Sequence, residues 1–399
     1  MHAPSTAPSG LPTARPEEVG LSSAGLRRLT DAMEREVAAG HAPGVSMLVA
    51  RHGKVAFAQS LGALGPGGPP MSADAIFRIY SMTKPIVSVA AMTLVEEGRL
   101  LLTDPLAKYI PAFAKTMVGV ENGDKLDLVA LKRPITIQDL MRHTSGLTYG
   151  FTGTSPVQKL VHAAAPMSQQ KSAAEHVEAL AALPLQHQPG EVWEYSHSTD
   201  VLGRVIEVVA GRSLGEFLQE RIFTPLGMTD TAFYVPDAKR ERLAQPYSFD
   251  MLTAARIDTI ESREPPRCEM GGGGLVSTIG DYARFLAMAS GGGGFNGARI
   301  LGSRTLAYMA SDHLGPNVVK NHFLLWPGHG FGLGFAVRLE PGIAPTAGAV
   351  GEYFWGGVAG TVFWISPRDA VFAILMVQAP EHREYFRLLY RNLVNAAIV

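Results

Sequence analysis

The chain has 399 residues, of which 46% are hydrophobic, and a formal net charge of -1. It holds enough apolar material for a large core, and it lacks the bulk positive charge that attracts nucleic acid. The single cysteine, Cys268, excludes an internal disulfide and fits a reducing compartment, where we expect a buried, inert thiol.

The first residues have the composition of a tail. The opening MHAPSTAPSGLPTARP is rich in proline and lacks the apolar core of a secretory signal. We therefore expect a flexible segment over residues 1–19 and a single catalytic unit over residues 20–399. Nothing later in the chain is apolar over a length that would span a bilayer. The sequence thus predicts a soluble, cytoplasmic protein without a membrane partner.

Each end of the chain predicts a helix and a hairpin. Residues 22–39 carry apolar side chains at helical spacing, with Ser22 as a cap. GVSMLVA and VAFAQSL flank a turn at 51–54 and predict an antiparallel hairpin. TVFWIS and AVFAILMVQ flank a turn at 367–369, and the second strand should be central because it is apolar on both faces. A closing helix is expected from about Glu381, with one side formed by Tyr385, Leu389, Leu393 and Ala396.

Between these ends the sequence predicts mostly helices and loops rich in glycine and proline. We expect an α/β part over about 20–80 and 327–399, and a mainly helical part over about 81–326, with a cleft where the two meet. The fold class is α/β of the α+β type, with an antiparallel sheet formed by the N- and C-terminal segments and flanked by helices. The glycine runs 271–274 and 291–294 lack the Gly-Lys-Ser/Thr of a phosphate loop and are interpreted as flexible loops.

GRSLG, which contains Ser213, fits the G-x-S-x-G pattern of a nucleophile on a strand-to-helix turn. The residues before it have helical rather than strand periodicity, and Gly211 suits a helix end. Ser213 to Glu216 matches a capping box, in which the serine accepts from a backbone N–H and the glutamate reaches back. We interpret Ser213 as a structural residue that joins two helices.

A second serine lies in FRIYSMTKPIVSVAAMTLVEEG, where Ser81 and Lys84 form an S-x-x-K arrangement. Pro85 is tolerated only near a helix start, so a helix should begin close to Ser81 and end before Gly98. Residues three apart share a helix face, so Lys84 can reach the hydroxyl and act as its base if burial keeps the amine neutral. By itself Ser81 fits a helix cap equally well. The same spacing at 168–171 has no apolar helix behind it and indicates solvated surface.

Two later segments supply partners for Ser81. Tyr195, in PGEVWEYSHSTDVLG, falls between a Pro-Gly loop and a helix, where its phenol could project into a cleft. The alternative is a half-buried tyrosine that is bonded to backbone. Trp355-Gly356-Gly357 stands at the entrance to a strand, where glycines permit a backbone or a ligand to approach closely or mark an ordinary bulge.

These three segments, in this order, resemble the serine β-lactamase and penicillin-binding-protein superfamily, and in particular the class C-like esterases called family VIII carboxylesterases. The similarity runs from about residue 20 to the C-terminus and includes SMTKPI, MRHTSGLTYG, EYSHS, PLGMTDTAF, GGGGLVST, FGLGFAV and WGG. It implies a β-lactamase-like fold with Ser81 as the acylated nucleophile. Lys84 and Tyr195 would accept the serine proton and return it to the leaving alcohol. The backbone N–H groups of Ser81 and Val358 would form the oxyanion hole.

Two departures from the β-lactamase pattern bear on the substrate. Trp355 replaces the usual lysine of Lys-Thr-Gly, and His197 stands where asparagine is common. Both changes favour uncharged esters. His197 is interpreted first as a neutral structural histidine and second as a cleft residue, and Tyr149 as a wall of the acyl pocket or part of the core. The candidate substrate-binding residues are Trp355, Gly356, Gly357, Tyr149 and His197.

The sequence thus predicts a serine carboxylesterase that acts on short-chain esters without a cofactor. No histidine spacing typical of a metal site is present, so we expect no metal. The expected partner is a small-molecule ester, and no oligomeric state is indicated. Three alternatives are a β-lactamase or D,D-peptidase, an acyltransferase to an alcohol, and a binding protein with a relic site. The missing Lys-Thr-Gly and export signal oppose the first, and the joint presence of Ser81, Lys84 and Tyr195 opposes the last.

Overall fold

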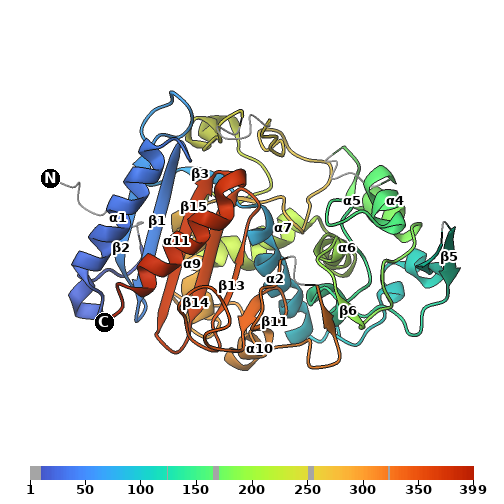
Figure 1. Cartoon of the computed structure of the whole chain (residues 1–399). Helices are drawn as coiled ribbons and strands as arrows, with labels where there is room; N and C mark the ends of the chain where they lie inside the picture. The colour runs from blue at the N-terminus through green and yellow to red at the C-terminus, as the bar shows by residue number, and fades with distance from the viewer. Residues whose placement is uncertain (1–9, 124, 165–169, 250–255, 322–323) are drawn as a thin grey trace.

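The computed structural model describes residues 10–123, 125–164, 170–249, 256–321 and 324–399 (Figure 1). Its main sheet has seven strands in the order β11-β12-β13-β14-β15-β1-β2, and every neighbouring pair is antiparallel. The strands are β1 (Gly44–Arg51), β2 (Lys54–Gly62), β11 (His329–Phe331), β12 (Ala336–Arg338), β13 (Tyr353–Gly356), β14 (Gly360–Ser366) and β15 (Val371–Gln378). The predicted sheet, built from the two ends of the chain, is confirmed.

Both predicted hairpins are present in this sheet. β1 and β2 form the first, and β14 and β15 form the second. β15 lies between β14 and β1, and all eight of its residues are buried. A strand covered on both faces has no solvent side to accommodate polar residues, which explains its continuous apolar sequence.

Two terminal helices cover one face of the sheet, α1 (Ser23–Ala38) and α11 (Arg383–Asn395), and they lie next to each other in Figure 1. Ser22 caps α1 as predicted, since its hydroxyl accepts from the Gly25 N–H at 3.1 Å. The apolar face expected for α11 is wrong by about one position. Tyr385 is 48% exposed, and the side chains that enter the core include Phe386, Tyr390 and Val394.

The physical reason for this shift is visible at Tyr390. Its hydroxyl donates to backbone carbonyls of the two central strands, with oxygen distances of 2.9 Å to Leu48 and 2.8 Å to Ile374. Apolar residues occur at helical spacing on two adjacent stripes of α11. The partner surface decides which stripe is buried, and a tyrosine can be buried fully when its hydroxyl finds an acceptor.

The opposite face of the sheet is covered by α9 (Ile279–Ser290), which contacts β1 and β15. Between the sheet and the helical region stands α2 (Thr83–Glu96), near the centre of Figure 1. The other helices are α3 (Ile137–Met141), α4 (Pro156–Ala164), α5 (Ala173–Ala181), α6 (Ser198–Ala210), α7 (Leu214–Leu218), α8 (Thr224–Leu226) and α10 (Ser303–Met309).

Short elements connect these helices. Paired strands are β3 (Ile76–Arg78) with β7 (Val276–Thr278), β4 (Val118–Asn122) with β5 (Lys125–Val129), β6 (Val192–Trp193) with β10 (Val319–Lys320), and β8 (Gly294–Phe295) with β9 (Ala298–Arg299). The 3-10 turns are Pro16–Val19, Tyr80–Met82, Leu106–Lys108, Pro111–Lys115, Asp237–Arg242 and Pro380–His382, and a π turn covers Gln219–Phe223. The α+β class with a helical region is confirmed, and the part boundaries near residues 81 and 326 stay predictions.

The predicted flexible tail over residues 1–19 is wrong for its second half, whereas residues 1–9 lie outside the described chain. Leu11 is buried, and Thr13 forms a bridge with Val55 of β2. The Ala14 N–H donates to the Val55 carbonyl at 3.0 Å, and the Val55 N–H donates to the Pro12 carbonyl at 2.8 Å. Proline tolerates an edge position, so this segment covers the free edge of β2.

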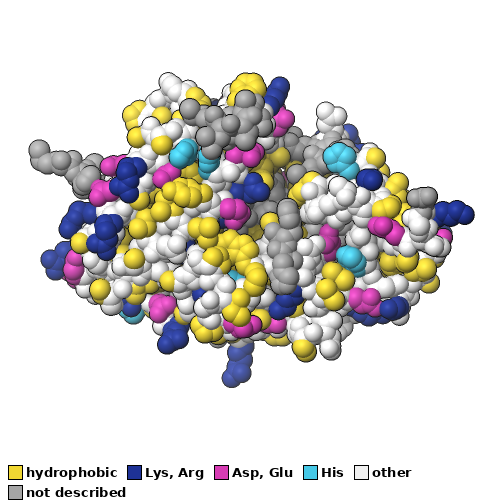
Figure 2. Space-filling view, in the orientation of Figure 1, with side chains coloured by type: hydrophobic (Ala, Val, Ile, Leu, Met, Phe, Trp, Pro, Cys, Tyr) yellow, Lys and Arg dark blue, Asp and Glu magenta, His cyan; other side chains and the backbone are white. Residues whose placement is uncertain are grey.

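The surface has a mixed charge distribution. On the face in Figure 2, basic and acidic side chains are intermixed, in keeping with the net charge of -1. Among the described helices, none combines the length and the apolar character needed to cross a membrane.

Candidate active site

Ser81 lies in the turn Tyr80–Met82, which leads directly into α2. The helix is buried from Thr83 to Leu94, and Gly98 follows its end with a φ of 69°. The start and end predicted for this helix are therefore confirmed. Tyr80, immediately before the serine, has a φ of 44°, in the left-handed region that such side chains rarely adopt. Backbone strain of this kind persists only where surrounding contacts hold a residue in place.

The structure brings the side chains of Lys84 and Tyr195, the two other predicted catalytic residues, to the hydroxyl of Ser81. The Tyr195 hydroxyl, 114 residues away in sequence, donates to Ser81 Oγ at 2.6 Å. Lys84 Nζ, one helical turn along, donates to the same oxygen at 3.3 Å. The Lys84 nitrogen also lies 4.5 Å from the centre of the Tyr195 ring. Both polar neighbours are thus within hydrogen-bond reach of one serine hydroxyl, as a proton-transfer pair requires.

Lys84 has two further acceptors around its nitrogen. Its Nζ donates to the Tyr149 hydroxyl at 3.3 Å and to the Gly272 carbonyl at 2.5 Å. The side chain is 1% exposed. Three oxygen atoms thus surround the lysine nitrogen, those of Ser81, Tyr149 and Gly272. The buried lysine is therefore held in one orientation.

Asp200, which the sequence analysis did not single out, lies behind Lys84 in the first turn of α6. Its carboxylate accepts from the Gly272 N–H at 2.7 Å and from His197 Nδ1 at 3.1 Å. Burial raises the pKa of Asp200, but the hydrogen bond and charge of His197, with the charges of His176 and Lys84, outweigh burial and lower it to about 2. The residue is an anion at neutral pH. Its position three residues after His197 on one helix was the only signal in the sequence.

Tyr149 and His197 lie beside this carboxylate. Burial and the negative charge of Asp200 raise the pKa of Tyr149 well above its ordinary value. The rings of Tyr149 and His197 meet edge to face, 4.3 Å between centres. His197 is 2% exposed, which agrees with the structural role expected first for it. The alternative, substrate binding by Tyr149 or His197, stays a prediction.

The glycine run 271–274 is not the flexible loop that was predicted. A Cβ on Gly271 would lie 2.6 Å from the Thr199 carbonyl oxygen, and a Cβ on Gly272 would lie 2.7 Å from the Asp200 carboxylate. Real Cβ contacts are longer, so these positions require glycine. The run packs against the first turn of α6 and brings the Gly272 carbonyl to Lys84.

The Trp355-Gly356-Gly357 segment closes the other side of the site. A Cβ on Gly357 would lie 2.4 Å from the Ile79 carbonyl oxygen, so glycine permits the close backbone approach anticipated from the sequence. The next residue, Val358, is 49% exposed, and within the described part of the chain its N–H has no acceptor. This N–H is free to bind a substrate oxygen, although its oxyanion role stays a prediction.

An aromatic wall lies beside Tyr195. The Trp355 ring is 6% exposed, with its centre 5.4 Å from that of Tyr195 and 5.2 Å from that of Phe331. His143 lies on the same side, 4.9 Å from the Tyr195 ring, and burial lowers its pKa well below the ordinary value. The histidine is therefore neutral, and this wall carries no net charge.

Residues 29–397 match the family model described as Beta-lactamase. The chain belongs to the β-lactamase family. Protein Rv1367c of Mycobacterium tuberculosis (strain ATCC 25618 / H37Rv) is 37% identical to this β-lactamase-family chain over 320 residues, which cover 78% of the chain and 79% of that protein.

Two further relatives of this β-lactamase-family chain carry names that refer to enzymes. Esterase EstB of Burkholderia gladioli is 32% identical over 356 residues, 84% of this chain and 85% of EstB. The solved structure of EstCE1, a hydrolase with promiscuous acyltransferase activity, superposes with a TM-score of 0.77 at 26% identity and covers 93% of this chain and 98% of EstCE1. The predicted resemblance to family VIII esterases is confirmed, and the matches support a serine hydrolase with the β-lactamase fold.

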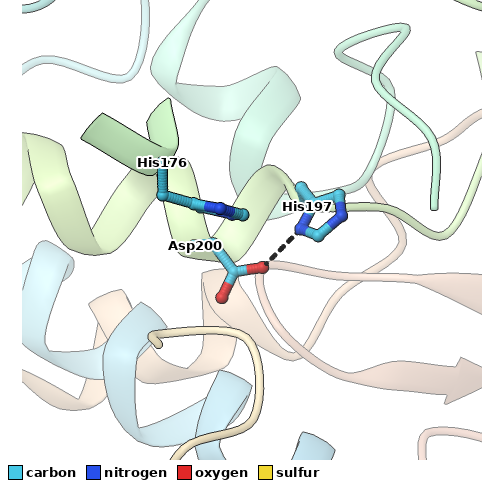
Figure 3. Close-up of side chains that lie close together, drawn as sticks. All are labelled: His176, His197 and Asp200. Atoms are coloured by element: carbon cyan, nitrogen blue, oxygen red, sulfur yellow. Dashed lines mark hydrogen bonds and ion pairs between the residues drawn. The ribbon is translucent and has the colours of Figure 1, made fainter. Parts of the chain in front are cut away.

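His176, His197 and Asp200 form a buried cluster that could be considered for a metal (Figure 3). Their donor atoms lie within 4.8 Å of one another. Donors that share a tetrahedral zinc at bond lengths of about 2.0 Å lie about 3.3 Å apart. Moreover, Asp200 already accepts from His197 and from the Gly272 N–H. The hydrogen bond between His197 and Asp200 accounts for two members of the cluster, while neither ring nitrogen of His176 has a hydrogen-bond partner among the described residues.

Ser213, in the G-x-S-x-G pattern, is a helix cap, as predicted. Its hydroxyl accepts from the Glu216 N–H at 3.2 Å, and its own N–H donates to the Glu216 carboxylate at 3.1 Å. α6 precedes it where an elbow would need a strand. Cys268 is buried, and burial raises its pKa to about 12, in agreement with the inert thiol expected. The second S-x-x-K begins at residue 168, which lies outside the described residues.

Proposed function

We propose that this chain is a serine carboxylesterase that hydrolyses short-chain, uncharged carboxylic esters through an acyl-enzyme on Ser81. The observation that carries the proposal is the convergence of Tyr195 at 2.6 Å and Lys84 at 3.3 Å on Ser81 Oγ. A nucleophile with two proton-transfer partners in reach is the minimum requirement for acyl transfer. EstB, an esterase by name, shares 32% identity over 84% of the chain, which supports the same class of reaction. The cytoplasmic location expected from the sequence stays a prediction.

The reaction proceeds in two halves. Ser81 Oγ attacks the ester carbonyl carbon while its proton passes to the Tyr195–Lys84 pair, which accepts it in the form where Lys84 is the neutral amine. The bond between that carbon and the alcohol oxygen breaks, and the pair returns the proton to the leaving alcohol. Water then attacks the acyl carbon and gives one proton to the pair. The bond to Ser81 breaks, the carboxylic acid leaves, and the proton returns to Ser81 Oγ.

The negative charge that develops on the carbonyl oxygen needs donors in place beforehand. Two backbone N–H groups can be these donors. One belongs to Val358, the exposed residue after Gly357, and the other belongs to Ser81, in the turn before α2. Loss of one such donor costs about 3 to 4 kcal/mol of transition-state stabilisation in hydrolases. The role of these two N–H groups explains why glycine precedes Val358, since a side chain there would push the segment away from Ile79.

An uncharged substrate is favoured by the aromatic wall. Trp355 occupies the position of a lysine that would meet a carboxylate, and it packs against Tyr195 and Phe331. We expect kcat/KM for a neutral p-nitrophenyl ester to exceed that for a matched ester with a terminal carboxylate by about tenfold or more, since a desolvated charge would lack a partner. Initial rates for the pair measure this preference. Equal rates for both esters would contradict it.

Active-site labelling tests the proposal directly. A fluorophosphonate reacts with an activated serine, and digestion followed by mass spectrometry locates the adduct. We expect stoichiometric labelling of Ser81 and none of Ser213, whose hydroxyl is engaged as a helix cap. Labelling of Ser213, or of no serine in the folded protein, would overturn the proposed function.

Acyl transfer to an alcohol is a second candidate, favoured by the likeness to EstCE1, a hydrolase with promiscuous acyltransferase activity. It shares every step up to the acyl-enzyme and differs only in the oxygen nucleophile that attacks last. Partition of one acyl-enzyme between water and added alcohol, followed by product analysis, separates the two. Hydrolysis as the sole outcome at high alcohol concentration would exclude this candidate.

A further inference from the structure

Lys84 is oriented by groups that do not touch Ser81. Two of its three acceptors are the Gly272 carbonyl and the Tyr149 hydroxyl, and Asp200 binds the N–H of Gly272. Asp200 Oδ1 accepts from the Gly272 N–H at 2.7 Å, and the negative charge of the same carboxylate raises the pKa of Tyr149. The carboxylate thus fixes the Gly272 side of the cradle around the lysine nitrogen.

Asp200 is in turn held by His197. The carboxylate accepts from His197 Nδ1 at 3.1 Å, as Figure 3 shows, and this contact assigns the proton to Nδ1. Both side chains are buried, with His197 2% and Asp200 8% exposed. His176 packs edge to face on His197, 5.2 Å between ring centres, and burial lowers the pKa of His176. The carboxylate cannot rotate without breaking these bonds.

A lysine needs such support because its terminal nitrogen lies at the end of a flexible four-carbon stem. Its distance to Ser81 Oγ is 3.3 Å, longer than that of Tyr195, so a small displacement would remove the contact. Misplacement of a reacting group by about 1 Å can lower a rate about 100-fold. The Asp200 carboxylate binds the N–H of Gly272, whose carbonyl accepts from Lys84, and so restrains the position of the lysine nitrogen.

We propose that His197 and Asp200 form a positioning dyad that holds Lys84 against Ser81 through Gly272, and so supports the acylation step. The inference rests on the proposed function of Ser81. Neither residue touches the reacting atoms, so both act through Lys84. His197 thereby receives a role in catalysis without contact to the substrate.

The first test is Asp200→Asn, which keeps the side-chain shape but removes the charge and one acceptor. We expect kcat for a neutral aryl ester to fall about 100-fold, with KM changed by less than about threefold, because binding is left intact while the lysine loses its position. Asp281→Asn is the matched control. Asp281 is also a buried carboxylate in the first turn of a helix and accepts a backbone N–H at 2.7 Å, from Asp230.

The control separates positioning from stability. Asp281 bonds to Asp230 and Thr231, which take no part in the site. Asp281→Asn is therefore expected to lower the thermal midpoint while kcat of the folded enzyme stays within about twofold. If Asp200→Asn behaves like Asp281→Asn, with lower stability and unchanged kcat, the residue is merely structural and the proposal is wrong.

The second test is rescue at His197. The amide nitrogen of asparagine occupies nearly the same place as Nδ1, so His197→Asn keeps a donor for Asp200, whereas His197→Leu does not. We expect kcat within about threefold of wild type for His197→Asn and a fall of about tenfold or more for His197→Leu, with similar KM for both. Equal kcat for the two variants would overturn the role of the His197 donor.

Labelling distinguishes this inference from the function on which it rests. If wild-type enzyme is labelled at Ser81 and Asp200→Asn retains full kcat, only the dyad fails. If wild type is not labelled at Ser81, the esterase proposal fails and the dyad with it. Metal analysis of purified wild type adds one outcome: a stoichiometric transition metal whose removal abolishes activity would make the cluster a metal site and overturn the dyad.

Discussion

Replacing Ser81 by alanine is expected to lower kcat for a neutral aryl ester by about 10⁴-fold or more, because loss of a serine nucleophile removes the covalent route entirely. The alanine variant keeps the start of α2, since no hydrogen bond from the Ser81 side chain caps that helix. Circular dichroism and thermal unfolding establish that the variant is folded. Initial rates at matched concentrations then measure the loss.

Ser213→Ala is the control for this experiment. Ser213 caps α7 and lies in the alternative nucleophile pattern, so its loss should reduce the free energy of unfolding by about 1 kcal/mol and leave kcat unchanged. The reverse result, with full activity in Ser81→Ala and none in Ser213→Ala, would refute the assignment of the nucleophile.

Tyr195→Phe is expected to reduce kcat by about 10²- to 10⁴-fold, the usual contribution of a general acid or base. The phenol is the closest polar group to Ser81 Oγ, at 2.6 Å, and phenylalanine preserves the ring that packs on Trp355 and His143. The loss should appear in the rate of acylation, measured from the burst of released alcohol. An acylation rate within about threefold of wild type would show that Lys84 transfers the proton without help from the phenol.

Tyr390→Phe is the matched control for loss of a buried tyrosine hydroxyl. Its hydroxyl donates to the carbonyls of Leu48 and Ile374 on the far side of the sheet from α9. Removal should cost about 1 kcal/mol of stability without an effect on kcat, because the hydrogen bonds lost are structural. A similar fall in activity for both variants would indicate a general effect on folding.

Local features of this protein were readable from the sequence. The capping serines Ser22 and Ser213 accept from N–H groups three residues on. Both hairpins depend on short turns between alternating or continuous apolar runs. The reach from Lys84 to Ser81 depends only on the pitch of a helical turn. In each case the interacting groups are neighbours in sequence, so a short pattern contains the whole interaction.

Predictions failed where the partner surface lies far away in the chain. Residues 10–19 were expected to be flexible because proline-rich composition does not reveal that the edge of β2 is free to pair with them. The stripe of α11 that enters the core depends on the carbonyls of β1 and β15. The glycine run 271–274 was taken for a flexible loop because the close approach of α6 cannot be read from glycine alone.

The sequence by itself determined the helices, the hairpins, the family resemblance and the adjacency of Ser81 and Lys84, since these depend on residues a few positions apart. Only the tertiary structure placed Tyr195 on Ser81, because these residues are 114 positions apart in the chain. It also placed Asp200 behind Lys84, through a hydrogen bond to Gly272, which is 72 positions from Asp200. Hydrogen bonds and charges act over a few ångströms. Their partners are therefore decided by how the sheet, α2 and α6 pack against one another.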